Sequence, residues 1–203
     1  MPAKPKFSRE EIIDAAIQVV KEKGMDALTA RELAAKLGSS ARPIFTVFKD
    51  MEELKNELKN TAQERAREYM DIASEYTPVL KKTAMQIIKF AIEEPKLFQL
   101  IYMSENKDST RMDELFQKHI AYEDDMIEII MNDYGLNRED AQALFRHTWI
   151  YNYGVSVLSA TRMCDFSEEE LNQLLGVIFH AMMMYIQAGR INDPTPFPEP
   201  LDQ

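Results

Sequence analysis

A group of small, polar and basic side chains between residues 29 and 49 could recognise another molecule by hydrogen bonding. Arg42 carries a planar guanidinium that can grip guanine O6 and N7 with two N–H donors, and Lys49 adds a charge that suits phosphate. Thr29 opens a short helical pattern, whose free backbone N–H groups form a natural phosphate site. The candidate DNA-contacting residues are Thr29, Ser39, Ser40, Ala41, Arg42, Pro43, Thr46 and Lys49.

Two short helical patterns, residues 30–37 and 41–47, position these side chains around Gly38. Glycine tolerates the positive φ that a tight turn between helices demands, and Ser40 can cap the second helix. The apolar residues expected between the two patterns are Leu33, Ala34, Leu37, Ile44, Phe45 and Phe48. With a helix over residues 9–23 they predict a three-helix head, whose last helix could enter a DNA major groove about 12 Å wide.

The charge of the chain is divided unevenly along its length. The total is −10, but residues 1–49 hold nine Lys and Arg against six Asp and Glu, a balance of +3. The remaining residues hold 15 against 28, a balance of −13. Since DNA phosphates repel an acidic body, this division would help present only the N-terminal end to a duplex.

Capping patterns mark the starts of several helices. A Ser, Thr or Asp three residues before a Glu lets each side chain accept a hydrogen bond from the backbone of the other. The pairs are Ser8–Glu11, Thr29–Glu32, Asp50–Glu53 and Ser167–Glu170. With the apolar periodicity they predict about nine helices and an all-α fold. The ranges are 9–23, 30–37, 41–47, 51–75, 78–93, 95–103, 109–132, 138–163 and 168–188.

Other features argue against an enzyme, a metalloprotein and a membrane protein. The six glycines are too scattered for a phosphate-binding loop, and no catalytic or cofactor motif occurs. The carboxylates from Glu123 to Glu128 could hold a metal with His119, but a solvated helix face is favoured. With one cysteine, no signal peptide and no membrane-length apolar run, we expect a cytoplasmic protein without cofactors.

The stretch "GMDALTARELAAKLGSSARPIFTVFKDMEEL", Gly24 to Leu54, resembles the head of the TetR family of bacterial transcriptional regulators. The resemblance implies DNA binding, usually as a repressor, by a homodimer. Members of that family often have Tyr at the position of Phe45, Tyr or His at that of Val47, and Lys at that of Met51. Lys49 and Lys55 could replace part of the phosphate contact that these apolar residues lack.

Residues 177–186, "VIFHAMMMYI", are apolar on nearly every side, so the helix needs two partners. One is the bundle of its own chain, and the other can be the same surface of a second subunit. Small residues at Ser156, Ser159 and Ala160 would let helices approach closely. We expect a homodimer through about 138–163 and 168–188, with heads roughly 34–36 Å apart or a multiple of it and an inverted-repeat operator.

Methionine and aromatic residues in the body could line an adaptable pocket, or they could be ordinary core. The candidate effector-binding residues are Phe116, His119, Trp149, Asn152 and Tyr153. "WIYNYG", from Trp149, resembles the Trp-His-Gly signature of one TetR subgroup, with Tyr153 in place of His. The resemblance implies that a small, mostly apolar effector shifts the helix expected at 51–75 and releases the operator. Control by a protein partner is the alternative.

These expectations divide the chain into three parts. Residues 1–50 would form the helix-turn-helix DNA-binding domain. Residues 51–190 would form an effector-binding and dimerisation domain, a helical bundle that pairs with a second copy. Residues 191–203 would form a Pro-rich tail, which consists of Ile191 followed by "NDPTPFPEPLDQ".

Overall fold

The structure is a computed structural model that describes residues 5–71, 78–104, 111–119 and 122–189. Only the backbone is described for Asp71, Asp113, Gln117, Lys118 and His119. The described ranges contain nine α-helices, two 3₁₀ helices and no strand, so the all-α prediction is confirmed. The elements are α1 (Arg9–Lys23), η1 (Met25–Ala27), α2 (Ala30–Lys36), η2 (Ile44–Thr46), α3 (Met51–Asp71), α4 (Val79–Glu93), α5 (Pro95–Tyr102), α6 (Met112–His119), α7 (Glu123–Tyr134), α8 (Arg138–Ala160) and α9 (Glu168–Gln187).

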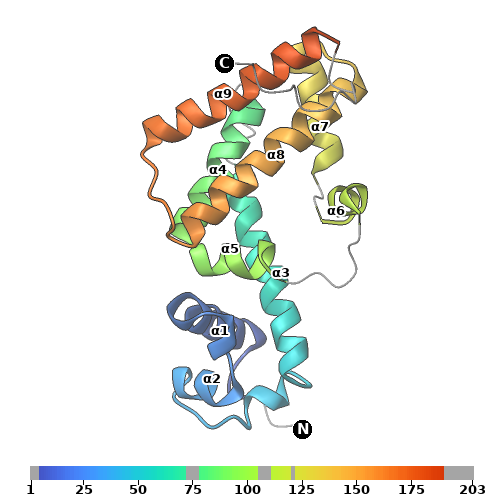
Figure 1. Cartoon of the computed structure of the whole chain (residues 1–203). Coiled ribbons are helices and arrows are strands. Elements are labelled where there is room, and N and C mark those ends of the chain that lie inside the picture. The colour runs from blue at the N-terminus through green and yellow to red at the C-terminus, as the bar shows by residue number, and fades with distance from the viewer. Residues whose placement is uncertain (1–4, 72–77, 105–110, 120–121, 190–203) are drawn as a thin grey trace.

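The chain forms a small head and a larger helical body (Figure 1). The head contains α1, η1, α2 and η2, and α3 leads from it into the body. At 1.5 Å per residue, α3 is about 30 Å long, enough to connect the two parts. In the body, α4 and α8 lie side by side, and α9 lies at the end farthest from the head.

The capping patterns explain where the helices begin. Ser8 and Ser167 each form a complete capping box with the Glu three residues later, as predicted. Thr29 accepts a hydrogen bond from the backbone N–H of Glu32, and Asp50 from that of Glu53. The carboxylates of Glu32 and Glu53 do not return the bond, because they bind basic side chains and the N–H of Lys49 instead.

The second helix of the expected helix-turn-helix is shorter than predicted. A helix over residues 41–47 was expected, but only the 3₁₀ helix η2 forms, over Ile44–Thr46. Its bonds run from Ile44 N to Ala41 O at 3.1 Å and from Thr46 N to Pro43 O at 3.2 Å. Proline disfavours the α conformation in the residue before it and supplies no N–H. Pro43 therefore gives a physical reason for a tight turn instead of two turns of α-helix.

Two other predicted helices differ from the structure. Residues 109–132 were expected to be one helix, but the described part contains α6 and then α7, with Tyr122 as the N-cap of α7. The helix expected over 138–163 ends at Ala160, and Arg162 follows with a φ of 57°. A positive φ in a residue other than glycine ends a helix, because a right-handed helix requires negative φ throughout.

The core of the head continues into the body. Buried residues from α1, α2 and η2 pack with the buried face of α3 and with Phe98 of α5 in one cluster. The head residues in this cluster include Ile12, Ile17, Val20, Leu33, Ile44 and Phe48, and the α3 residues are Leu54, Leu58, Ala62 and Ala66. Lys21 of α1 also forms an ion pair with Glu94, at 2.5 Å from Nζ to Oε1. The division expected at residue 50 stays a prediction, and packing is continuous across it.

None of the described helices has the length and the apolar content that crossing a bilayer would require.

Candidate nucleic-acid interface and body cavity

The turn between α2 and α3, residues 39–49, presents most of the predicted DNA-contacting side chains, and we call it the reading turn. It begins after Gly38, whose φ of 58° confirms the expected left-handed conformation. Ile44 and Phe48 are 0% and 1% exposed and fix the turn to the head core. Ser39 N donates to Ala34 O at 2.9 Å, which ties the start of the turn to α2.

The structure brings seven of the eight predicted contact residues together on this turn, and Thr29 caps the start of α2. The exposed ones are Thr29, Ser40, Arg42, Thr46 and Lys49, and the partly buried ones are Ser39, Ala41 and Pro43. Two hydroxyls are already engaged, because Thr46 donates to Pro43 O at 2.6 Å and Thr29 accepts from Glu32 N at 3.2 Å. The expectation that Ser40 caps the second helix is wrong, since no side chain caps η2.

Phe45 lies on the outside of the reading turn, which corrects the prediction that it packs in the head core. Its exposed fraction is 43%, whereas its neighbour Ile44 is fully buried. The 3₁₀ geometry of η2 gives the reason: three residues complete a turn, so Ile44 and Val47 point to one side and Phe45 to another. An apolar ring therefore stands on the candidate interface beside Arg42 and Thr46.

The basic residues of the head fall into two groups. Arg9, Lys21, Lys23 and Lys36 each form an ion pair with a carboxylate. Among the described residues, no ion pair is formed by Lys6, Arg31, Arg42 and Lys49, and all four are exposed. Lys6 instead donates to Ser39 Oγ at 3.1 Å, at the start of the reading turn. Cations without an ion pair attract phosphate, so Arg31 and Lys6 are two further candidates for phosphate contact. Neither was predicted from the sequence pattern.

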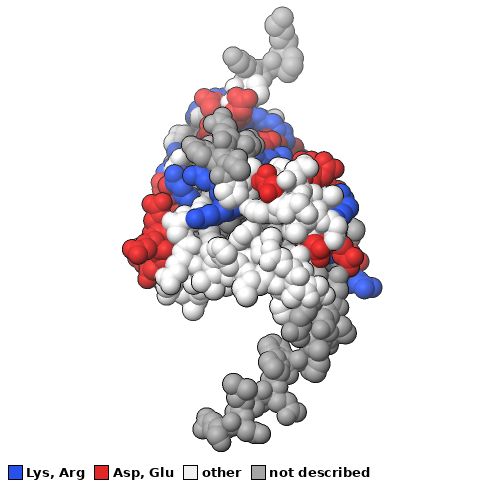
Figure 2. Space-filling view, turned by 90° about the horizontal axis from the view of Figure 1, so that it is seen from above, with Lys and Arg blue, Asp and Glu red and all other residues white. Residues whose placement is uncertain are grey.

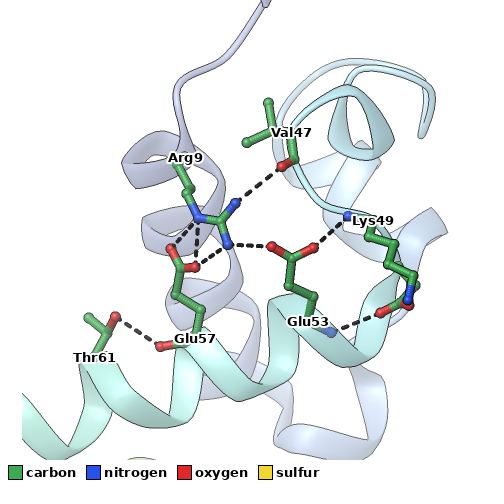
Figure 3. Close-up of polar contacts among 7 residues, drawn as sticks. Arg9, Val47, Lys49, Glu53, Glu57 and Thr61 are labelled. Carbon is green, nitrogen blue, oxygen red and sulfur yellow. Dashed lines mark hydrogen bonds and ion pairs between the residues drawn. The ribbon is translucent and has the colours of Figure 1, made fainter.

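Arg9 joins α1, the reading turn and α3 through a network of hydrogen bonds (Figure 3). Its guanidinium bonds to Glu57 (Nε to Oε2, 2.6 Å) and to Glu53 (Nη2 to Oε1, 2.6 Å), both on α3. It also donates to the carbonyl of Val47 at 3.2 Å and stacks over the Phe48 ring at 4.2 Å. Glu53 in turn accepts from Lys49 N at 2.7 Å. This Arg9 network fixes the C-terminal end of the reading turn against α3.

The network favours the charged forms of Arg9 and Glu53. Hydrogen bonds from Arg9 to Glu57 and then Glu53 raise the pKa of the guanidinium. Arg9, followed by the Lys49 N–H, lowers the pKa of Glu53 below its usual value of 4.5. Since both shifts favour the charged forms, the network is present at neutral pH and weakens in acid.

Three of the predicted effector-binding residues, Phe116, Trp149 and Tyr153, come together in a closed aromatic cluster. Trp149 stacks on Tyr153, with ring centroids 5.4 Å apart and an interplanar angle of 9°. Trp149 also meets the edge of Phe116 at 5.2 Å, and the Tyr153 hydroxyl donates to Tyr102 O at 2.8 Å. The space left beside these rings is only about 10 Å³. The side chain of His119 lies outside the described residues.

A more spacious cavity lies between α4, α8 and α9, and we call it the body cavity. Its volume is about 210 Å³. Its lining residues are Pro78, Leu80, Lys81, Ala84, Tyr134, Thr148, Asn152, Leu175, Gly176, Ile178, Phe179 and His180. Asn152 borders both this cavity and the small space of the aromatic cluster. Of the four predicted effector residues whose side chains the structure describes, only Asn152 lines the body cavity.

Two buried side-chain oxygens of α8 have no hydrogen-bond partner in the described part of the chain. Asn152 Oδ1 and Ser156 Oγ are both enclosed, with 6% and 0% of the residues exposed. Leaving a buried acceptor unsatisfied costs about 1–3 kcal/mol. The single chain therefore leaves two buried hydrogen-bond acceptors of the body unsatisfied.

The end of the body farthest from the head has an uncharged area with Asp and Glu at its edges (Figure 2). In α9, Val177 and Met184 are exposed by 64% and 71%, although the segment 177–186 is almost wholly apolar. This agrees with the expectation that one chain cannot bury the segment alone. The expectation that Ser156 and Ala160 serve a second subunit is wrong, because both are buried inside their own chain.

Comparison with known proteins identifies the head. Residues 12–58 match the family described as "Bacterial regulatory proteins, tetR family". The head is similar to the N-terminal domain of the TetR family. The matched residues run from the first buried turn of α1 to Leu58 of α3, so they include the whole reading turn and both carboxylates of the Arg9 network. No curated protein gave a significant match.

Solved structures extend the TetR-like fold to the body. A protein with unknown function from Rhodococcus sp. RHA1 is 19% identical, with a TM-score of 0.65 over 92% of this chain and 98% of that one. A TetR-like transcriptional regulator from the same organism is 16% identical, with a TM-score of 0.61 over 92% and 100%. A TetR variant from Acinetobacter baumannii AYE, in complex with minocycline, is 14% identical, with a TM-score of 0.57 over 90% and 98%.

These findings support a DNA-binding transcriptional regulator, not an enzyme. The similarity to the TetR family agrees with the free cations and the exposed ring of the reading turn. Among the described residues no group of three or more His, Cys, Asp or Glu side chains could hold a metal. Glu123, which the metal alternative required, is instead bound to Arg146 at 2.8 Å. Assignment of the body to the Trp-His-Gly subgroup stays a prediction.

Proposed function

We propose that this TetR-type regulator binds an inverted-repeat operator as a homodimer in the cytoplasm and is a repressor that a small, mostly apolar effector releases. The observation that carries the proposal is the reading turn. It is fixed from behind by Ile44, Phe48 and the Arg9 network, and it exposes groups suited to base edges and phosphates. Such rigid support is what a DNA-reading element requires.

Within the reading turn, we assign base recognition to Arg42, Thr46 and Phe45. Arg42 is exposed and makes no ion pair with any described residue, so its five donors are available for a guanine edge. The Phe45 ring is suited to a thymine methyl group, which no polar side chain contacts as well. Ser39, Ser40, Ala41 and Pro43 are small enough to let the backbone come close to the groove.

Phosphate contacts are assigned to the free cations around the reading turn. Lys49 lies at its end, Lys6 at its start, and Arg31 in the first turn of α2 beside Thr29. They replace the polar groups that the family often has at the positions of Val47 and Met51. Both of these residues are partly buried and pack against the head core here, so they cannot supply such contacts.

We assign the dimer contact to the exposed apolar faces of α8 and α9. Val177 and Met184 of α9 and Ile150 and Leu158 of α8 are exposed hydrophobic side chains. A two-fold axis through these helices would hide them and place the two heads on one side of the dimer. Heads about one duplex turn apart then require two matching half-sites, which makes the operator an inverted repeat.

Release by an effector requires that the body and the head be coupled. The shared core along α3 and the Lys21–Glu94 ion pair connect the head to α3 and α5. An effector that binds one arrangement of the body more tightly would change the spacing of the heads. The body cavity favours a small molecule over the alternative of a protein partner. By linkage, operator DNA must weaken effector binding by the same factor by which the effector weakens operator binding.

A binding-site selection with the purified protein tests this function. Random duplexes are enriched at moderate salt, sequenced, and used to measure affinity against a scrambled duplex. Recovery of one inverted repeat with half-site centres about 10 base pairs, or a multiple, apart is the expected result. Equal affinity for every duplex would contradict a specific regulator. Salt dependence alone does not decide the matter, since non-specific binding also falls steeply with salt.

A further inference from the structure

The side chain of Asn152 is placed to bind a ligand in the body cavity. It stands at 6% exposure on α8, and its Oδ1 has no partner. Thr148, one helical turn earlier on the same face, is satisfied internally, since its hydroxyl donates to Leu144 O at 2.7 Å. Ser156, one turn later, is buried but lines neither cavity. Asn152 is therefore the polar residue of this face that lines the cavity and has an unpaired side-chain oxygen.

The cavity suits a molecule of about one ring with small substituents. Its volume of about 210 Å³ exceeds that of an engineered cavity of roughly 150 Å³ that binds benzene in another protein. Apolar side chains make up most of the wall, including Leu80, Leu175, Ile178 and Phe179. Such a wall binds apolar surface, and one convergent polar group fixes the orientation.

The charges around the cavity favour a neutral ligand. Lys81, the one lining residue with a permanent charge, is exposed to solvent. His180 is also exposed, and its Nδ1 lies 2.7 Å from the carbonyl of Gly176, which can only accept a hydrogen bond. The buried polar residues of the lining are Thr148 and Asn152, which carry no charge. A charged ligand group beside Asn152 would lose its hydration without gaining a counter-charge.

We propose that the body cavity takes a neutral molecule of about one ring, whose hydroxyl or amide N–H donates to Asn152 Oδ1. The inference rests on the proposed function, because it names the chemical class of the effector. Asn152 also has donors, so a ligand group that both donates and accepts is matched best. A hydroxyl attached to an apolar ring has this combination.

The experiment compares 4-ethylphenol with 4-ethylanisole, its methyl ether, which has nearly the same apolar body and no donor. Binding to the full chain is measured by titration calorimetry and by the fluorescence of Trp149. That residue is the only tryptophan of the chain and lines the neighbouring space together with Asn152. The phenol is expected to bind about tenfold more tightly than the ether, because only the phenol satisfies the buried acceptor.

Two variants assign the preference to the proposed contact. Asn152→Leu keeps a similar volume and removes the acceptor, so the phenol and the ether should bind with affinities equal within about twofold. Asn132→Leu, at an exposed position of α7 that lines neither cavity, should keep the full preference. Circular dichroism and thermal melting check that both variants fold.

The outcomes separate this inference from the proposed function. The inference is wrong if neither compound binds at millimolar concentration, if both bind equally to the unchanged protein, or if Asn152→Leu keeps the preference. Operator binding without any ligand is measured on the same samples. A protein that selects an inverted repeat but shows no preference for the phenol keeps its regulatory function and loses only this ligand class.

Discussion

The head and the body differ in how far a single chain satisfies its own groups. In the head, the buried side chains of α1, α2 and η2 are closed by α3, and Arg9, Lys21, Lys23 and Lys36 have carboxylate partners. In the body, Asn152 Oδ1 and Ser156 Oγ are buried without a partner among the described residues, a cavity remains between α4, α8 and α9, and α9 exposes apolar side chains.

This difference separates two kinds of recognition. The head holds the reading turn with buried and paired side chains and leaves Arg42 and Lys49 without an ion pair to any described residue. The surface proposed to bind DNA therefore exists before the DNA arrives. The body leaves buried oxygens unpaired, a cavity unfilled and apolar side chains exposed. An effector and a second subunit would fill or cover these, so the final arrangement of the body depends on them. A regulator needs both properties, because a rigid reader can be controlled only through a part whose state can change.

Placing charges on the exposed apolar face of α9, in the body, should have the largest effect on operator binding. The double variant Val177→Glu with Met184→Glu places charges on the exposed face of α9, and desolvating them would oppose dimerisation. We expect a monomer that binds the operator at least about a hundredfold more weakly, because two linked heads gain avidity. Sedimentation and fluorescence anisotropy measure both. Asn132→Glu, an exposed change on α7, should remain a dimer; a dimeric double variant would contradict the assigned face.

Removing a free cation of the head should weaken recognition more than removing a paired one. Arg42→Ala is expected to cost about 1–3 kcal/mol of operator binding and to relax base preference at one position of each half-site. Lys36→Ala, which removes a cation already bound to Glu22, should change affinity little. Titrations with operator and scrambled duplexes decide this. Equal losses on both would make Arg42 a phosphate contact.

The conformation of Gly38 tests whether the reading turn is held in place by its backbone. Gly38 has a φ of 58°, and an added Cβ would meet no atom within 4 Å, so strain is the expected cost of a side chain. Gly38→Ala should destabilise the fold by about 1–2 kcal/mol. Gly154→Ala, in α8 with equal space but without a positive φ, should be neutral or stabilising. Urea unfolding measures both, and equal effects would contradict the strain argument.

The Arg9 network tests whether the head positions the reading turn without touching DNA. Arg9→Gln removes the bonds to Glu53, Glu57 and Val47 O, so the end of the turn should become more mobile. Operator affinity is expected to fall about three- to tenfold, and scrambled DNA should show a smaller loss. Faster hydrogen exchange at residues 47–54 would confirm the positioning role. Unchanged exchange with reduced affinity would indicate direct contact with DNA.

Acid should weaken the same network, and this is the smallest expected effect. The pKa of Glu53 is lowered in the fold, so its contribution is fully present above the usual value of 4.5 and is lost as pH falls through the lowered value. Thermal melting between pH 3 and 7 should show a shallower acid decline in Glu53→Gln than in the unchanged protein. Glu52→Gln, at the exposed neighbouring position, should decline like the unchanged protein.

The positions of most helix starts could be predicted from the sequence, since capping is a local interaction. Ser8 and Ser167 form the expected boxes, Asn137 caps α8, and Gly38 takes the expected positive φ. The length of η2 was harder to predict. The apolar spacing of Ile44, Phe45 and Phe48 suits an α-helix, but the effect of Pro43 on its neighbours competes with it.

The candidate effector site shows what depended on packing between distant segments. Phe116, Trp149 and Tyr153 do lie together, but whether aromatic rings enclose a ligand or each other depends on distances that no local pattern encodes. In the structure these rings pack against one another, and the cavity lies instead between α4, α8 and α9. Among the predicted residues with a described side chain, only Asn152 lines it.

By itself, the sequence determined the helical class, the helix starts, the charge division and the TetR-like head, because each rests on neighbouring residues or on composition. Only the tertiary structure decided which cations are free, where Phe45 points, that Arg9 supports the reading turn, and which face of α8 borders a cavity. The physical reason is that a side chain's burial and partners are set by helices that lie far away in the chain, such as Arg9 with Glu57.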